Sequence, residues 1–279
     1  MTRRLSLDVP DDLLAAVQER AAAEGVGVAH VVRGILAEAL DLQHHSLFQV
    51  STSGALVEGV NDGCVSVADL RRHGDFGVGT FDGLDGELVM LDGRCYRARG
   101  DGRVLEAPDE ALTPFAVVTR FHADRTVELH ELGSLGSLIE RLDGERTTDN
   151  LFLGIRATGT FERLDLRAAC RTELGVPLVE ATSHQEEWSL SEVRGTLVGF
   201  WSPTYSRAVA VPGYHLHFVS DDLQQAGHVL GLRIGALHVE LHELHDIHLA
   251  LPESESFVHA DLRRDPSDDL EVAEHETRR

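Results

Sequence analysis

The sequence contains no lysine: all 25 basic residues among its 279 are arginine. Because an internal Schiff base requires a lysine amine, enzymes that work through a lysine aldimine or iminium are excluded. The phosphate-loop lysine of nucleotide hydrolases and the strand lysine of protein kinases are also absent.

Positive charge is scarce as well, since 25 basic residues face 47 acidic ones and the net charge is −22. So acidic a chain is a poor general ligand for nucleic acid or anionic membrane. No apolar run approaches the roughly 18 residues of a membrane span, and the N-terminus lacks the apolar stretch of a secretion signal. Three scattered cysteines, none in CxxC spacing, favour a reducing compartment. We therefore expect a cytoplasmic protein with no membrane partner.

The first 45 residues differ in pattern from the rest of the chain. Alternation over residues 4–9 predicts a strand, and apolar residues at helical spacing predict helices over about 11–24 and 28–42. Strand, helix and helix in this order resemble the ribbon-helix-helix family of small DNA-binding dimers. That family pairs its strands between two chains, so the resemblance implies dimerisation.

Charge argues against DNA binding by this segment. The strand positions that would face DNA are Arg4, Ser6 and Asp8, and Asp8 would meet phosphate. Residues 1–45 contain four arginines against seven acidic residues, which is unusual for a DNA reader. We therefore favour an oligomerisation or packing element, and divide the chain into this segment, 1–45, and a body, 46–279.

Short strands dominate the body, and the predicted fold class is α/β, more closely a β-rich α+β fold. Asp92-Gly93 between two apolar runs predicts a two-residue hairpin turn. One short helix is predicted over 134–142, and the charged tail after Pro266 has the composition of a disordered segment. The predicted strands are 87–91, 95–99, 103–106, 115–121, 126–132, 151–160, 195–202, 209–218, 229–234 and 236–243.

A group of three histidines carries the strongest chemical signal. His215 and His217 stand two apart in a predicted strand and so share one face. A polar loop follows, and His228 returns beside them if the next run pairs as an antiparallel hairpin. Three imidazoles with a fourth position open are typical of catalytic zinc. The same ligands also accept Ni²⁺, Fe²⁺ or Cu²⁺.

A second histidine group has a simpler explanation. His238, Glu240 and His242 share one face of a strand whose other face is apolar, and His245 and His248 follow. Such alternation is typical of a half-exposed strand without any ligand. We do not predict metal there, and we assign His44-His45 to a loop or linker.

Two further features point to a site. The stretch from His73 to Glu87 contains five glycines, which indicates sharp turns or close backbone approach before Glu87. Arg156 lies in an otherwise apolar strand, and a buried arginine needs an anion. That anion is either a carboxylate of the protein or a substrate carboxylate held by two hydrogen bonds.

Several separated motifs together resemble the alpha-acetolactate decarboxylase family. The resemblance covers about residues 48–274, and it implies a two-domain fold of mixed sheets, usually dimeric, with zinc held by His215, His217 and His228. The motifs are Gly213-Tyr214-His215-Leu216-His217-Phe218 with Gly227-His228, the 73–87 stretch, Thr113-Pro114-Phe115-Ala116 and Gly195-Thr196-Leu197-Val198-Gly199-Phe200.

The resemblance also implies which residues act on the substrate. Thr80, Glu87 and Arg156 match the family's active-site threonine, glutamate and arginine. A second functional glutamate is assigned to Glu274, with Glu271 and Glu276 as neighbouring alternatives. On this assignment the charged tail folds over the site.

The implied reaction is decarboxylation of 2-acetolactate to acetoin and CO₂. Zinc would act as Lewis acid on the keto and hydroxyl oxygens, and Arg156 would orient the carboxylate. Either Glu87 or Glu274 would donate a proton, and Thr80 would orient a group by hydrogen bonding. Two alternatives remain: another zinc lyase or hydrolase on the same scaffold, and a metabolite-sensing regulator whose N-terminal segment binds DNA.

Overall fold

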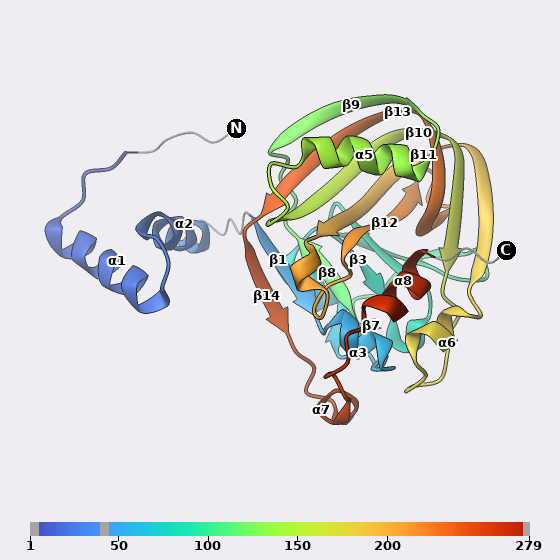
Figure 1. Ribbon diagram of the computed structural model, residues 1–279, viewed down its shortest axis with the longest axis horizontal. Coiled ribbons are helices and arrows are strands. Elements are labelled where there is room, and N and C mark those ends of the chain that lie inside the picture. Colours follow the sequence, from blue (N-terminus) through green and yellow to red (C-terminus); the bar gives the residue numbers. More distant parts are fainter. Residues whose placement is uncertain (1–5, 40–44, 276–279) are drawn as a thin grey trace. The chain divides into compact units, whose positions relative to one another are not determined.

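The computed structural model describes residues 6–39 and 45–275, and the chain divides into two compact units between His44 and His45 (Figure 1). Within residues 6–39, the N-terminal unit contains α1 (Asp11–Glu24) and α2 (Val28–Ala39). Asp11 and Asp12 occupy the first turn of α1, where the helix dipole favours negative charge. Both predicted helices are therefore found, and the part of the second beyond Ala39 lies outside the described residues.

The strand expected over residues 4–9 is not found in its described part. Residues 6–10 have no regular secondary structure, and residues 4 and 5 lie outside the described range. The described residues therefore contain the two helices of the expected strand-helix-helix pattern.

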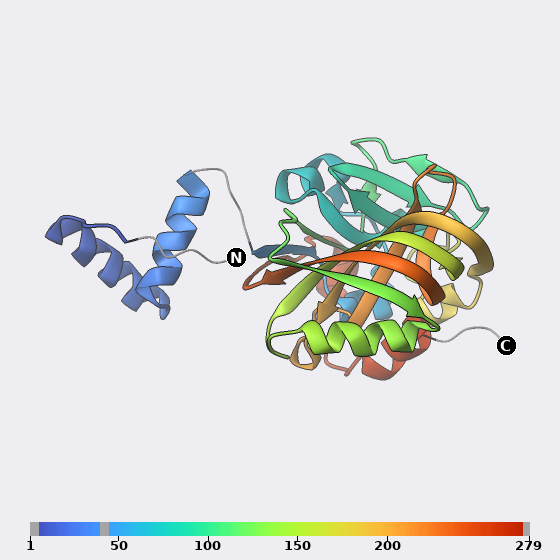
Figure 2. The same ribbon diagram turned by 90° about the horizontal axis from the view of Figure 1, so that it is seen from above.

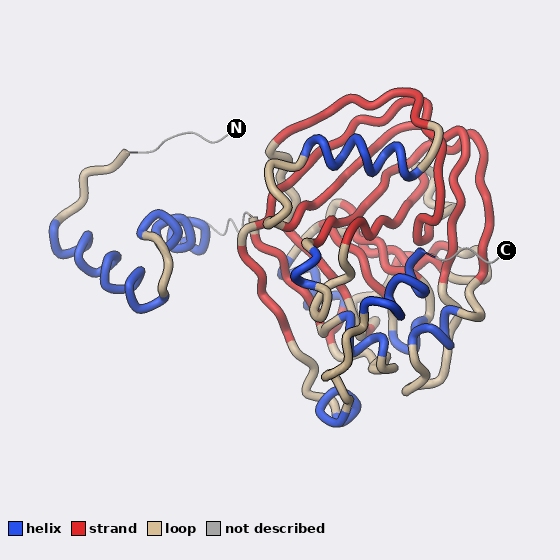
Figure 3. Tube along the Cα trace, viewed as in Figure 1, coloured by secondary structure: helices blue, strands red, loops and turns tan. Residues whose placement is uncertain are grey.

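Within residues 45–275, the larger sheet of the body has seven strands in the order β14-β1-β8-β3-β4-β5-β6 (Figures 1 and 3). β1 pairs in parallel with β14 and antiparallel with β8, so the sheet is mixed. The strands are β1 (Ser46–Val50), β3 (Phe76–Thr80), β4 (Glu87–Leu91), β5 (Arg94–Ala98), β6 (Val104–Glu106), β8 (Ala116–Thr119) and β14 (Asp246–Ala250).

The second sheet of the same part of the chain has five strands in the order β10-β11-β12-β13-β9. β13 also pairs with β10, and Figure 2 shows the strong curvature of these long strands. Its strands are β9 (Arg125–Leu132), β10 (Phe152–Ala168), β11 (Glu186–Ser202), β12 (Gly213–Ser220) and β13 (Ala226–Leu244). A small separate ribbon pairs β2 (Val65–Ser66) with β7 (Leu112–Thr113).

Short helices cover the sheets. α5 packs on β9 and β13, while α3, α6 and α8 pack together beside the ends of β12 and β13 (Figure 1). The helices are α3 (Ser53–Val57), α4 (Val67–His73), α5 (Leu135–Glu145), α6 (Leu178–Thr182), α7 (Glu255–His259) and α8 (Ser267–His275), with 3₁₀ turns at 82–84 and 204–206. None of the helices that the structure describes is long and apolar enough to cross a membrane.

The main hydrophobic core lies between the two sheets. Val78 and Val89 of the larger sheet pack in one cluster with Val198 and Phe200 of the smaller one, and all four are buried. A second cluster lines the smaller sheet beneath α5. The predicted β-rich α+β class is confirmed.

Most predicted elements are present, with shifted boundaries. The turn between β4 and β5 has positive φ at both Asp92 (51°) and Gly93 (76°), as expected for the predicted hairpin. β12 starts at Gly213 rather than Val209, because Pro212 has no N–H for a ladder hydrogen bond. The tail predicted as disordered forms α8 instead, because Leu270 and Ala273 are buried against the core.

Candidate metal centre and active site

The three histidines form a compact triangle. His215 and His217 share one face of β12, and His228 of β13 stands directly opposite His217 in the ladder. The Nε2 atoms of His215 and His217 are 3.2 Å apart. The three pairs of ring centroids are separated by 4.9, 5.2 and 5.3 Å.

Hydrogen bonds orient two of these rings. Nδ1 of His217 lies 2.9 Å from the carbonyl oxygen of Leu88, and Nε2 of His228 lies 3.2 Å from that of Glu274. A carbonyl oxygen only accepts, so each of these ring nitrogens carries the hydrogen. The opposite nitrogens, Nε2 of His217 and Nδ1 of His228, therefore hold lone pairs. A carbonyl partner of this kind is typical of histidines that bind metal.

Burial keeps both rings neutral. Desolvation lowers the pKa of His217 to about 3, and desolvation together with Arg167 lowers the pKa of His228 well below its ordinary value. Nδ1 of His228 is buried and makes no hydrogen bond within the described residues. A buried nitrogen that accepts no hydrogen bond has lost its contact with water without compensation, which is costly unless it binds another group such as a metal ion. Neutral imidazoles and this bare nitrogen fit a metal ion.

Two glutamates approach the triangle from different elements. Glu87 begins β4, and its Oε2 lies 3.6 Å from Nε2 of His217. Glu274 of α8 places Oε2 3.7 Å from Nε2 of His215 and 3.6 Å from Nδ1 of His228. Burial raises the pKa of Glu87 to about 7, outweighing the opposing effects of Arg167 and of the Ala169 N–H, which donates to Oε1 at 3.0 Å. Glu87 can therefore carry a proton near neutral pH.

An arginine completes the charged groups of the site. Arg167 of β10 stands opposite His228 in the ladder, and its side chain is 4% exposed. One terminal nitrogen donates to Glu274 at 3.1 Å, and the other donates to Oε1 of Gln185 at 2.6 Å. Gln185 in turn donates to Glu187 at 2.8 Å. The guanidinium is thus held in one orientation beside the histidines.

A tight turn places Glu87. Thr80 ends β3 opposite Glu87 in the ladder, and its hydroxyl donates to the carbonyl oxygen of Gly86 at 2.9 Å. Gly86 has φ of +93°, and a Cβ there would lie 2.3 Å from the carbonyl oxygen of Ala98. Only glycine fits this position, so the glycine-rich stretch provides the close approach that the sequence predicted.

A small cavity of about 40 Å³ joins these groups. Thr80, Glu87, Arg167, His215, His228 and Glu274 form its polar lining, and apolar side chains from α3, α6 and neighbouring loops form the remainder. The apolar members include Leu56, Leu84, Phe115, Leu178 and Val211. The pocket is therefore lined by both charged and apolar side chains.

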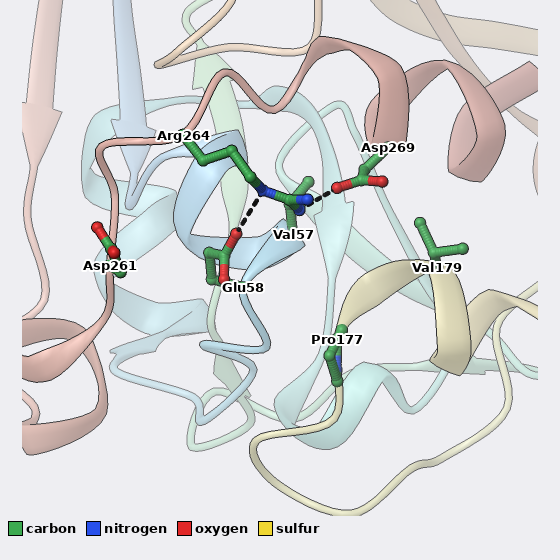
Figure 4. A pocket seen from close by; sticks show the side chains of 7 residues that line it. All are labelled: Val57, Glu58, Pro177, Val179, Asp261, Arg264 and Asp269. Atoms are coloured by element: carbon green, nitrogen blue, oxygen red, sulfur yellow. Dashed lines mark hydrogen bonds and ion pairs between the residues drawn. The ribbon is translucent and has the colours of Figure 1, made fainter.

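A larger cavity of about 440 Å³ is lined in part by Asp269 of α8 (Figure 4). Arg264 extends between Glu58 and Asp269, with Nε 3.2 Å from the Glu58 carboxylate. Asp269 belongs to α8, the helix that carries Glu274. Through these two ion pairs, Arg264 connects α8 to Glu58 at the C-terminal end of α3.

Comparisons with known proteins agree on one family. The model of the family "Alpha-acetolactate decarboxylase" matches residues 47–264. A relative of that name from Methanosarcina mazei is 42% identical over 229 residues, covering 82% of this chain and 80% of the relative. Another from Lactococcus lactis is 36% identical, covering 82% of this chain and 98% of that one. The chain belongs to the alpha-acetolactate decarboxylase family.

Solved structures agree with this assignment. The crystal structure of alpha-acetolactate decarboxylase from Bacillus subtilis strain 168 matches with a TM-score of 0.80 at 34% identity, covering 83% of this chain and all of that one. The residues that the family model matches, 47–264, all lie in the body.

Within this family fold, Arg156 is not among the described residues that line the pocket beside the histidines. Its terminal nitrogens donate to Asp92 at 2.9 and 3.2 Å, and its Nε lies 3.5 Å from Glu240. The anion that binds Arg156 is thus a carboxylate of the protein, that of Asp92, and the ion pair is partly exposed. The arginine beside the histidines is Arg167, further along the same strand β10.

The structure brings together Thr80, Glu87, Glu274 and the three histidines, as the family resemblance implied. Sequence reasoning missed Arg167 and Gln185. Local alternation gave no signal for Arg167, because the register of β10 against β13 shifts between Asp165 and Leu166.

The competing histidine set does not assemble into one site. His238 contacts Glu128, Glu240 pairs with Arg156, and His242 is fully buried. Glu274 lies at the site, whereas Glu271 is exposed and Glu276 lies outside the described residues.

Proposed function

We propose that this chain decarboxylates 2-acetolactate to acetoin and CO₂, using zinc held by His215, His217 and His228. The observation that carries the proposal is the convergence of three histidines, two carboxylates and Arg167 at one site, in a member of this family. The relatives' names supply the substrate.

The histidines would hold the metal through nitrogens that carry no proton. Nε2 of His217 and Nδ1 of His228 are the candidate donors, since the other nitrogen of each ring binds a carbonyl oxygen. When bound, the metal supplies Lewis acidity to the keto and hydroxyl oxygens of the substrate. Zinc is the proposed ion because borderline-soft imidazole ligands with an open position suit catalytic zinc.

Arg167 would bind and orient the substrate carboxylate. Its guanidinium already holds a carboxylate, that of Glu274, and Gln185 fixes its plane. As the bond between the carboxylate carbon and its neighbour breaks, the electron pair moves toward the ketone oxygen and CO₂ leaves. A buried, preorganised cation is most effective at such charge movement because no water must reorganise.

Glu87 would deliver the proton that replaces CO₂. Burial raises the pKa of Glu87 to about 7, and no guanidinium among the described residues donates to it, whereas the carboxylate of Glu274 already accepts from Arg167 at 3.1 Å. Thr80 would position Glu87 by holding the carbonyl oxygen of Gly86. Delivery from one fixed side would yield a single acetoin enantiomer.

The test is acetoin formation from racemic acetolactate, analysed on a chiral column with and without a chelator. We expect one enantiomer, lost with chelator and restored by zinc. Spontaneous breakdown yields no single enantiomer, so chirality separates enzyme from background. A protein that holds stoichiometric zinc but forms no acetoin would contradict the proposed substrate, and turnover of an ester or lactone would then favour a zinc hydrolase.

We further propose a cytoplasmic homodimer in which residues 1–45 mediate pairing and residues 46–279 catalyse. Supporting this, Leu13, Leu14, Val28, Ile35 and Leu36 are exposed on the two helices of the N-terminal unit. The three cysteines are unpaired, in keeping with a reducing compartment. Light scattering on the full chain and on Leu14→Glu/Ile35→Glu tests whether residues 1–45 take part in pairing. We expect a smaller assembly for the variant than for the wild type. A gel shift at low salt tests the DNA-binding alternative.

A further inference from the structure

A second group of metal-ligating side chains lies outside the active site, where the two sheets of the body meet. His45 directly precedes β1, Asp124 directly precedes β9, and His242 lies near the end of β13. One ligand atom of each lies within 4.8 Å of those of the other two. The rings of His45 and His242 have centroids 5.0 Å apart.

The backbone of one residue orients two of these three side chains. The N–H of Glu243 donates to Oδ2 of Asp124 at 2.8 Å, and its carbonyl oxygen accepts from Nδ1 of His45 at 2.6 Å. Because the carbonyl only accepts, Nδ1 of His45 carries the hydrogen and Nε2 holds the lone pair. A histidine that donates to a backbone carbonyl and a carboxylate that accepts from a backbone N–H are the usual supports of a metal site.

We propose that His45, Asp124 and His242 bind a second divalent metal ion of the Zn²⁺ or Co²⁺ class. Two imidazoles and one carboxylate suit such borderline-soft ions, with water in the remaining positions, whereas Mg²⁺ and Ca²⁺ prefer several oxygen ligands. Burial differs among the three residues. His242 is fully buried, while His45 and Asp124 are about one-third exposed, so an ion has access from the surface side.

The position gives this ion a structural role. β1 belongs to the seven-stranded sheet, β9 and β13 belong to the five-stranded sheet, and β13 leads into β14, which pairs with β1. An ion on these three residues would link the two sheets where the chain crosses between them. Since an unfolded chain does not present the three ligands together, binding stabilises the folded state.

The experiment counts metal ions on the full chain, free of any affinity tag. The protein is stripped with chelator and dialysed against Co²⁺ or Zn²⁺, and the bound metal is measured by elemental analysis. We expect two ions on the wild type and one on Asp124→Asn or His45→Asn, with acetoin formation unchanged. In Asp124→Asn the side-chain amide keeps an oxygen that can accept from the Glu243 N–H, so this variant preserves the fold. If Asp124→Asn binds as many ions as the wild type, the proposal is overturned.

Two further variants make the outcome specific. His238→Asn removes an exposed histidine of the same strand, which contacts Glu128, and should retain both ions. His215→Asn disrupts the catalytic centre and should retain the second ion, with a higher unfolding temperature when metal is present. That increase should vanish in His215→Asn/Asp124→Asn. An increase that persists in the double variant would refute the site, independently of whether the first centre binds zinc.

Discussion

Replacing Arg167 by glutamine should remove most of the activity, whereas the same change at Arg156 should leave it. Both residues lie in β10, so the pair is a matched test of position. Arg167 is almost fully buried and donates to Glu274 and Gln185, whereas Arg156 pairs with Asp92 at a partly exposed site.

The magnitudes follow from burial. Breaking a buried pair and leaving Glu274 unpaired costs about 3–5 kcal/mol of unfolding free energy. Losing a preorganised donor to developing charge lowers kcat by about 10²–10³-fold. The exposed pair of Arg156 contributes about 0.2–1 kcal/mol, and its loss should leave kcat unchanged. Arg167→Lys keeps the charge, but a compact ammonium cannot reproduce the two-armed contact, so we expect an intermediate kcat.

Chiral acetoin analysis, thermal unfolding and bound zinc should be measured together on Arg167→Gln, Arg167→Lys and Arg156→Gln. Retained zinc with lost turnover would separate substrate orientation from metal binding. If Arg156→Gln lost activity as fully as Arg167→Gln, or if Arg167→Gln remained active, the assignment of the substrate-binding arginine would be refuted.

Four other substitutions test the remaining groups. Glu87→Gln should keep zinc but lose about 10²–10⁴-fold in turnover, since it cannot donate a proton; near-normal activity would contradict the acid role. Glu274→Gln should lower the unfolding temperature, because the buried Arg167 loses its charged partner; an unchanged temperature in calorimetry would count against this ion pair. Gly93→Ala should lower the free energy of unfolding by about 1–2 kcal/mol, because of its positive φ alone. Gly86→Ala should lower it clearly more, because its Cβ would also clash with the carbonyl oxygen of Ala98. Equal losses in denaturant unfolding would show that the backbone around Gly86 shifts to avoid this clash.

Local pattern was enough to predict several parts of this fold. The turn at Asp92-Gly93, the helix beginning near Leu135 and the shared face of His215 and His217 each depend on residues close together in the sequence. His228 could be added because a short loop and an antiparallel hairpin leave few other registers.

Arg167 shows where local pattern fails. Simple alternation groups it with Arg163 and Asp165, yet Arg163 is exposed while Arg167 is buried. The ladder between β10 and β13 shifts register between Asp165 and Leu166, and a bulge re-aims the side chains that follow it. Arg156 matches the pattern of a charged residue in an apolar strand. Its partner, however, is Asp92 in the turn between β4 and β5, which is distant in the sequence.

The sequence by itself determined the chemistry available to this protein: histidine, carboxylate and arginine without lysine, and two histidines on one strand face. Tertiary structure decided which arginine joins them, that a charged tail becomes a helix carrying Glu274 into the pocket, and that His45 meets Asp124 and His242. The reason is physical. Alternation and turn chemistry act over a few residues, whereas burial, register shifts and charge pairing arise only when distant segments pack against one another.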